Sequence, residues 1–269
     1  MRTDVDHYAV FGNPIAHSMS PKIQMYFAEK TGEKMDYKPV LVPTGEFKTT
    51  ADLFFKVGSG CNITIPCKMD AFAYADELTN EARAAGAVNT LKKMDDGHVV
   101  GHNTDGLGLV ADLKRLNINL KSARILILGA GGAARGIIAP IMAEEPASLT
   151  VTNRTVEKAE LLAKTFEVGF SSFTQLNGRY DVIINATSSS LSNVLPPLPN
   201  CIFEKAEAAY DLMYSKEGST IFTAKAEKLG CEKVADGFGM LIMQAACSFY
   251  FWRAVTVDAE DAVRHFRQW

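Results

Sequence analysis

Residues 124–135 read RILILGAGGAAR, and this stretch decides the fold class. Its first part, Arg124–Leu128, is apolar without polar alternation, which is typical of a strand covered on both faces of a parallel sheet. Gly129, Gly131 and Ala134 then fill a G-x-G-x-x-G/A pattern, which supplies a tight turn, close backbone approach to a pyrophosphate, and close helix–strand packing. Free N–H groups at the start of the following helix would hold phosphates. The stretch therefore predicts a dinucleotide-binding α/β unit.

The end of the next expected strand, Leu149–Thr152, indicates which dinucleotide is bound. A carboxylate about 20 residues after the glycine turn binds the ribose of NAD, whereas arginine accommodates the 2′-phosphate of NADP. Here the strand is followed by Asn153-Arg154-Thr155, with Lys158 one turn into the next helix and no acid at the strand end. Arg154 can meet a phosphate with a charge-assisted fork that a carboxylate would oppose. A merely solvated basic patch is the alternative, and the upstream glycine turn favours NADP.

The composition excludes several other classes of protein. The chain has 269 residues, 47% of them hydrophobic, and a formal net charge of −3, which gives no reason to expect a nucleic acid or a membrane as partner. The five cysteines are scattered without a C-x-x-C pair, and the five histidines have no metal-ligand spacing. We see no secretory signal and no apolar stretch of about 18 residues. We therefore expect a reduced, cytoplasmic protein without a metal.

The first third of the chain alternates strands with helices, which predicts a mostly parallel sheet. Ser20 resembles an N-cap before Pro21 at the first helical position. A polar turn over Asp95–Gly97 joins two strands into a hairpin. A second α/β unit follows, and the chain ends with two helices. The expected strands and helices are Asp6–Phe11, Ser20–Lys30, Met35–Leu41, Phe47–Val57, Cys61–Ile65, Met69–Tyr74, Asn80–Ala84, Asn89–Lys93, Val99–His102, Thr104–Leu116, Ile125–Leu128, Ala133–Ala143, Leu149–Thr152, Val156–Phe166, Val182–Asn185, Ala208–Leu212, Thr220–Leu229, Met240–Trp252 and Asp258–Phe266.

Three segments carry polar residues suited to a substrate pocket. Ser18–Ser20 precedes the first helix, although capping explains one of these serines. In Asn62–Lys68 we expect Ile63 and Ile65 to face one way and Asn62 and Thr64 the other. Lys68 lies past the carboxyl end of that strand, at the ligand edge of open α/β sheets, but alone it could be a surface lysine. Asp105 could likewise be a first-turn acid favoured by the helix dipole.

Taken together and in order, these motifs resemble shikimate dehydrogenases, the NADP-dependent enzymes of aromatic amino acid biosynthesis. The resemblance covers essentially the whole chain. It runs through Gly12–Ser18, Asn62–Lys68, Gly86–Thr90, Asn103–Gly106, Gly129–Arg135, Asn153–Thr155, Asn185–Ser189, Tyr210–Tyr214 and Asp236–Leu241.

The resemblance implies a reversible reduction of 3-dehydroshikimate to shikimate by NADPH, with Lys68 and Asp105 as the catalytic pair. It implies a substrate domain, residues 1–103 and 238–269, to which the last helices return, and a Rossmann-like NADP domain, residues 104–237. The substrate-binding residues it implies are Ser18, Ser20, Thr64, Asn89, Tyr214 and Gln244. The cofactor-binding residues it implies are Gly129, Ala130, Gly131, Gly132, Ala133, Asn153, Arg154, Thr155, Lys158, Thr187, Met213 and Gly237.

Elementary chemistry agrees with several of these roles. A lysine ammonium can stabilise and protonate the alkoxide formed from a ketone, although the sequence leaves open whether Lys68 is an acid/base or a charged anchor. Gln244 lies among apolar neighbours, and a buried amide needs a polar partner. Cys67, Ser190 and Ile221 depart from the family pattern, but none removes a polar group from the proposed chemistry.

Two rival functions remain open. A quinate/shikimate dehydrogenase of dual cofactor use is disfavoured by the missing acid after Thr152. A ligand-sensing relative without turnover is disfavoured because Lys68 and Asp105 are both present. For the assembly we expect a monomer or a homodimer.

Overall fold

The computed structural model describes residues 5–189 and 194–268, and the chain divides into two compact units. The first unit extends to Gly108 and resumes at Ile242, and the second comprises Leu109–Leu241. Both divisions fall inside helices, α5 (Asp105–Arg115) and α9 (Phe238–Arg253), whereas the boundaries expected from the sequence precede these helices. Ser190, one of the departures from the family pattern, lies outside the described residues.

The first unit contains a mixed sheet with the strand order β2-β1-β3-β5-β6-β4. β1 pairs in parallel with β2 and with β3, as the alternation of strands and helices predicts, and β4 is parallel to β6. The expected hairpin of β5 and β6 adds the antiparallel pairs β3–β5 and β5–β6. The strands are β1 (Asp6–Gly12), β2 (Met35–Leu41), β3 (Gly58–Ile63), β4 (Glu77–Leu78), β5 (Thr90–Lys93) and β6 (Val99–His102).

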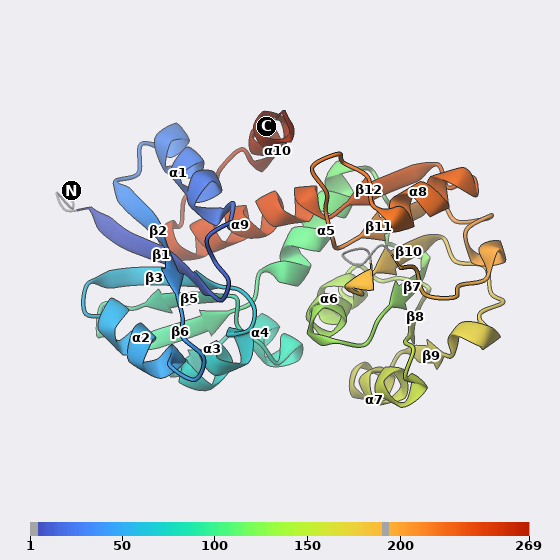
Figure 1. Ribbon diagram of the computed structural model, residues 1–269, viewed down its shortest axis with the longest axis horizontal. Coiled ribbons are helices and arrows are strands. Elements are labelled where there is room, and N and C mark those ends of the chain that lie inside the picture. Colours follow the sequence, from blue (N-terminus) through green and yellow to red (C-terminus); the bar gives the residue numbers. More distant parts are fainter. Residues whose placement is uncertain (1–4, 190–193, 269) are drawn as a thin grey trace. The chain divides into compact units, whose positions relative to one another are not determined.

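Helices cover both faces of this sheet (Figure 1). On one face lie α1 (Ser20–Thr31), α10 (Ala259–Arg267) and the last part of α9, and on the other α2 (Phe47–Phe54) and α3 (Lys68–Tyr74). A short helix, α4 (Asn80–Ala85), precedes the hairpin. The alternation of β3 explains this arrangement, because Cys61 and Ile63 pack in the apolar cluster with α2 and α3 while Asn62 bonds Ser248 of α9.

Two local predictions in this unit are wrong. Ser20 is not the N-cap of α1 but its first residue, and it is the Ser18 hydroxyl that accepts a hydrogen bond from the Ser20 N–H, at 3.3 Å. The strand alternation does not continue to Ile65, because β3 ends at Ile63 and Cys67 N–H turns back to the Thr64 carbonyl. Ile65 is consequently 69% exposed, whereas Ile63 is buried.

The second unit contains a fully parallel sheet with the order β12-β11-β10-β7-β8-β9. Numbered from β7, this is the 3-2-1-4-5-6 order of a Rossmann fold. The strands are β7 (Arg124–Leu128), β8 (Ser148–Thr152), β9 (Gly169–Ser171), β10 (Val182–Asn185), β11 (Ala208–Asp211) and β12 (Lys233–Asp236). β4, β9 and β12 were not predicted; they are short and lie at the edges of their sheets.

β7 is buried on both faces, as its apolar run predicts. Ile125 and Ile127 belong to the apolar cluster formed with α5, α6 (Gly132–Met142) and α7 (Val156–Phe166). Leu126 and Leu128 belong to the cluster on the opposite face, which includes α8 (Ile221–Lys228) and two 3₁₀ turns, Phe173–Gln175 and Asn200–Ile202. Among residues 5–189 and 194–268, no helix has both the length and the apolar composition needed to cross a membrane.

Candidate active site

The glycine turn of the second unit connects β7 to α6. Gly129 has φ = +108°, and a Cβ there would lie 3.1 Å from the Ala186 carbonyl oxygen, so a larger residue would be strained. Among the described residues, no atom outside the adjoining backbone lies within 4 Å of the position that a Cβ would take at Gly131 or Gly132. The backbone at the start of α6 is therefore accessible to a phosphate.

A cavity of about 620 Å³ opens over this turn. It brings together the predicted cofactor residues Gly129–Ala133, Asn153, Arg154 and Thr187. The other lining residues were not predicted as cofactor residues, although three of them, Ala186, Ser188 and Ser189, lie in the Asn185–Ser189 motif. Those residues are Phe173, Ala186, Ser188, Ser189, Val194, Leu195, Pro196 and Pro197.

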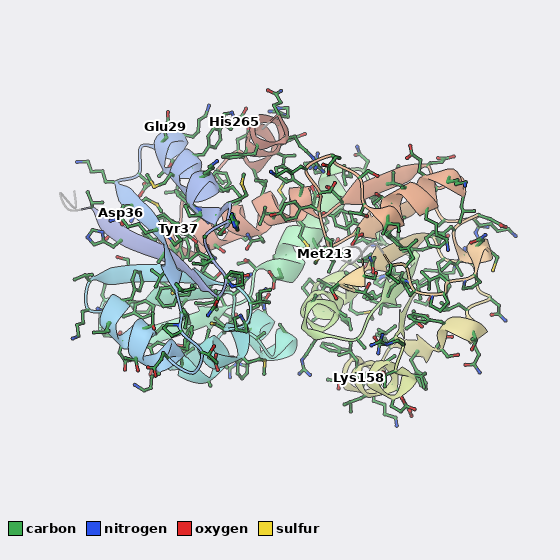
Figure 2. The ribbon with its side chains drawn as sticks, viewed as in Figure 1. Glu29, Asp36, Tyr37, Lys158, Met213 and His265 are labelled. Atoms are coloured by element: carbon green, nitrogen blue, oxygen red, sulfur yellow. The ribbon has the colours of Figure 1, made fainter. Side chains whose placement is uncertain are left out.

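The remaining predicted cofactor residues lie outside the lining of this cavity. Thr155 is the N-cap of α7, and Lys158 is an exposed residue of its first turn (Figure 2). Met213 and Gly237 follow the carboxyl ends of β11 and β12, and Gly237 N–H donates to the Met213 carbonyl at 3.0 Å.

The chemistry of the cavity fits a phosphorylated dinucleotide. Main-chain N–H groups at a helix start suit a pyrophosphate, and the exposed guanidinium of Arg154 suits a further phosphate. Apolar side chains of Phe173, Val194 and Leu195 provide surface for a base.

In the first unit, Lys68 and Asp105 meet. Lys68 is the first residue of α3 and Asp105 the first residue of α5, and the Lys68 Nζ lies 2.6 Å from Asp105 Oδ2. The two side chains are 31% and 20% exposed, so the pair is partly desolvated yet reachable by a small molecule. Asn103 helps to fix the main chain at the start of α5, because its Oδ1 accepts from the Asp105 N–H at 3.0 Å.

Asn89 holds the second oxygen of this carboxylate. Its Nδ2 donates to Asp105 Oδ1 at 2.8 Å. Its Oδ1 accepts from Thr104 N–H at 2.9 Å and from the Thr90 hydroxyl at 2.8 Å. These bonds fix the orientation of the Asn89 amide, because its oxygen accepts from two donors and its NH₂ group donates to the Asp105 carboxylate. Both carboxylate oxygens of Asp105 accept hydrogen bonds, which keeps the lysine ammonium in a fixed position.

A buried polar network continues behind Asn89. Thr104 Oγ1 accepts from Asn89 Nδ2 at 3.0 Å, lies 3.2 Å from Ser248 Oγ, and donates at 3.4 Å to Gln244 Oε1. Gln244 thus has the polar partner that its apolar surroundings require. Ser248 also accepts from Asn62 Nδ2 at 2.9 Å. Thr104 lies in the Asn103–Gly106 motif but was not predicted as a site residue, and no sequence signal singled out Ser248, one helical turn after Gln244.

The network ends at Tyr37 of β2, whose position Figure 2 marks. The Tyr37 hydroxyl donates to Asn62 Oδ1 at 2.8 Å. Burial raises the pKa of Tyr37 well above its usual value, so the phenol stays protonated and acts as a donor. The side chain of Ser20, one of the predicted substrate residues, partly offsets this rise in the pKa of Tyr37.

The other predicted substrate residues follow the carboxyl ends of β1 and β3. Ser18 and Ser20 come after β1, and Thr64 comes directly after β3, with its N–H bonded to the Phe11 carbonyl at 2.9 Å. Tyr214 belongs to the second unit, where its ring contacts that of Phe238. The described residues contain no group of three or more histidine, cysteine, aspartate or glutamate side chains that could hold a metal ion.

Comparison with known families gives two matches that follow one another along the chain. Residues 10–91 match the shikimate dehydrogenase substrate binding domain, and residues 112–196 match the shikimate/quinate 5-dehydrogenase family. The chain belongs to the shikimate dehydrogenase family. The resemblance inferred from the sequence motifs is therefore confirmed.

Individual proteins similar to this chain match all or nearly all of its length. The NADP(+) shikimate dehydrogenase of Vibrio cholerae is 49% identical over 100% of this chain and 98% of its own length. The structure of an Ael1 enzyme from Pseudomonas putida is 38% identical with a TM-score of 0.93, over 97% of each chain. The Thermus thermophilus shikimate 5-dehydrogenase in complex with NADP(H) and shikimate is 32% identical with a TM-score of 0.88, over 97% of this chain and 99% of that one. The predicted α/β fold class is confirmed.

Proposed function

We propose that this chain catalyses the reversible, NADPH-dependent reduction of 3-dehydroshikimate to shikimate in aromatic amino acid biosynthesis. The observation that carries the proposal is the Lys68–Asp105 pair, oriented by Asn89 in the unit that matches the family's substrate-binding domain. Family membership, with the NADP-dependent relative from Vibrio cholerae at 49% identity over the whole chain, supports the reaction and its cofactor.

The second unit is the NADP domain in this proposal. When bound, NADPH would supply the hydride for the carbonyl carbon. Gly129–Ala133 would hold its phosphates through main-chain N–H groups, and Arg154 with Lys158 would bind the 2′-phosphate. Asn153, Thr155, Thr187, Met213 and Gly237 complete the binding residues. The topology supports this assignment, because ligands of open α/β sheets bind beyond the carboxyl ends of the strands, and all these residues lie there.

The first unit is the substrate domain. Ser18, Ser20 and Thr64 follow the carboxyl ends of β1 and β3, and we assign them, with Tyr214, to the carboxylate and hydroxyl groups of the substrate. We also assign Asn89 and Gln244 to the remaining hydroxyls. Gln244 is oriented through its Oε1 by the buried Thr104 hydroxyl, which supports this role because a preorganised amide binds substrate without further ordering. The Asn89 amide already donates to Asp105 Oδ1 and Thr104 Oγ1, so a substrate hydroxyl would have to share or replace one of these bonds.

Lys68 Nζ donates to the carbonyl oxygen and passes a proton to the alkoxide as it forms. Asp105 keeps Nζ in place through the 2.6 Å contact. In the reverse direction the neutral amine accepts the proton of the substrate hydroxyl. A lysine in this role supplies both charge and proton, so the reaction requires no metal ion.

The direct test is the NADPH absorbance on addition of 3-dehydroshikimate. Wild-type enzyme should consume NADPH, and Lys68→Ala should lower kcat by about 10²–10⁴-fold, the range for general acid–base catalysis. Lys48→Ala is the matched control, since Lys48 also contacts an aspartate, Asp52, at 2.7 Å but lies exposed on α2. No turnover by the wild type would refute the proposed reaction.

Further arms of the same assay test the remaining assignments. EDTA should leave the rate unchanged, and NADH or quinate should support far slower turnover than NADPH with 3-dehydroshikimate or shikimate. Fractionation of the source cells tests the cytoplasmic location that a biosynthetic reductase implies. Light scattering distinguishes a monomer from a homodimer.

A further inference from the structure

Three buried polar residues stand in a row at the ends of neighbouring strands in the second unit. Asn185, Asp211 and Asp236 are the last residues of β10, β11 and β12, and the strand register pairs Asn185 with Asp211 and Asp211 with Asp236. Their exposed fractions are 0%, 0% and 1%. Burying an amide or a carboxylate costs free energy that an apolar residue would not. A row of three therefore calls for a structural reason.

Each residue of the row organises the loop that follows it. Its side-chain Oδ1 accepts a hydrogen bond from the main-chain N–H two residues later, so the same turn recurs at three adjacent strands. The acceptor–donor pairs are Asn185 with Thr187 at 3.1 Å, Asp211 with Met213 at 3.0 Å, and Asp236 with Phe238 at 3.3 Å.

Asp211 also links these loops sideways. Its Oδ1 accepts from Asn185 Nδ2 at 3.1 Å, and its Oδ2 accepts from the Thr220 hydroxyl at 2.7 Å. The loops after β11 and β12 touch directly, because a Cβ at Gly237 would lie 2.1 Å from the Leu212 carbonyl oxygen. Displacing the loop after β11 would therefore disturb the loop after β12 as well.

The topology identifies the half of the cofactor that these loops face. A Rossmann unit consists of two mononucleotide-binding halves that meet where the strand order reverses. The reversal here lies between β7 and β10, and Arg154 follows β8 on one side of it. The 2′-phosphorylated adenosine half belongs on that side. The loops after β11 and β12, with Met213 (Figure 2) and Gly237, belong to the half that receives the nicotinamide mononucleotide.

We propose that Asp211 is a positioning residue that sets the nicotinamide half of the cofactor site through the Met213 N–H, with Asn185 and Asp236 extending its effect to the neighbouring loops. This inference rests on the proposed NADP-dependent function. Asp211 is fully buried and acts on the cofactor only through the loop that it holds.

The test compares NADP⁺ with adenosine 2′,5′-bisphosphate, a fragment that lacks the nicotinamide half, by isothermal titration calorimetry. Asp211→Ala should weaken NADP⁺ binding about tenfold or more, the factor of one hydrogen bond to a charged group. Its affinity for the bisphosphate should equal that of the wild type. Asp211→Asn should bind both ligands like the wild type, because its oxygen still accepts from Met213 and its amide can donate to Thr220.

Asp181→Ala is the matched control at the opposite, amino-terminal end of the sheet. Asp181 likewise accepts from a main-chain N–H, that of Arg124 at 2.8 Å, and also pairs with the Arg124 side chain. Its loss should lower stability and leave both affinities unchanged. If Asp211→Ala does not fold, Asp236→Ala supplies the same comparison, since Asp236 accepts from Ser215 and Phe238 N–H.

The outcomes separate the inference from the proposed function. A parallel loss of both affinities in a folded Asp211 or Asp236 variant, or no loss at all, would overturn the positioning role. Failure of the wild-type protein to bind either ligand would instead overturn its assignment as an NADP enzyme.

Discussion

Replacing Thr104 by valine removes one buried hydroxyl and keeps the shape of the side chain. The hydroxyl lies 3.0 Å from Asn89 Nδ2 and 3.2 Å from Ser248 Oγ, both ordinary hydrogen-bond distances. Its contact with Gln244 Oε1, at 3.4 Å, is long and contributes less. Thr104 is fully buried, so no solvent replaces these partners.

Two ordinary hydrogen bonds at about 1 kcal/mol each give a loss of about 2 kcal/mol in the free energy of unfolding. For a chain of this size that corresponds to a fall in Tm of about 4–8 °C. Asn89 and Gln244 also lose part of their orientation. If about 1–2 kcal/mol of substrate binding depends on that orientation, the KM for 3-dehydroshikimate rises about 5- to 30-fold. The KM for NADPH should not change, because Thr104 lies in the first unit.

Steady-state kinetics with each substrate varied in turn, together with a thermal melt, measure both effects. Thr104→Ser keeps the hydroxyl and should restore the KM for 3-dehydroshikimate. Thr223→Val is the stability control, because it removes a buried hydroxyl of the α8 capping box in the second unit. It should lower Tm without changing the KM for 3-dehydroshikimate. The reasoning fails if Thr104→Val melts early with both KM values unchanged, or if both rise together.

Three further predictions follow from single side chains. Arg154→Ala should raise the KM for NADPH about tenfold or more while leaving that for NADH unchanged, since only the former ligand carries the 2′-phosphate; an equal change for both cofactors would contradict the role of Arg154. Gly237→Ala places a Cβ 2.1 Å from the Leu212 carbonyl oxygen. A thermal melt should therefore show a loss of about 1–3 kcal/mol in the free energy of unfolding, and a titration should show weaker NADP⁺ binding. A variant as stable as the wild type would show that the loops after β11 and β12 can separate freely. Burial lowers the pKa of His102, so below about pH 6.5 the unfolded chain binds a proton that the buried ring does not, and the free energy of unfolding falls. The decrease in Tm between about pH 7.5 and about pH 5.5 should therefore be smaller in His102→Gln than in the wild type. An equal decrease in both proteins would rule out His102 as its source.

The Rossmann half of the fold was predictable because its signals are local. The apolar run of β7, the glycine turn and the first turn of α6 are contiguous, and each requires a particular residue type at a particular position. Arg154 was found by the same logic, since it directly follows a strand that the apolar pattern had located. The short edge strands were missed because two to four residues without a clear period carry too little pattern.

The side-chain network behind Lys68 could not be predicted in the same way. Asn62, Thr90 and Ser248 lie on β3, β5 and α9, far apart in the sequence, and only the pairing of these strands and the packing of α9 bring them together. The error over Ser20 has a similar origin. A one-residue difference in where a helix begins decides which of two nearby serines bonds the backbone.

Both units nevertheless carry the same sequence signal, which is a polar residue at the carboxyl end of a buried strand. Asn62 near the end of β3 and Asn185 at the end of β10 each hold a loop that carries predicted site residues. Burying such an amide costs free energy, and this cost is tolerated where the amide holds a loop of the site in place. Asp211 and Asp236 follow the same logic. An unexplained amide or carboxylate at the end of an apolar strand therefore indicates which loops need a fixed geometry. The glycine turn carries different information, because it identifies only the class of cofactor.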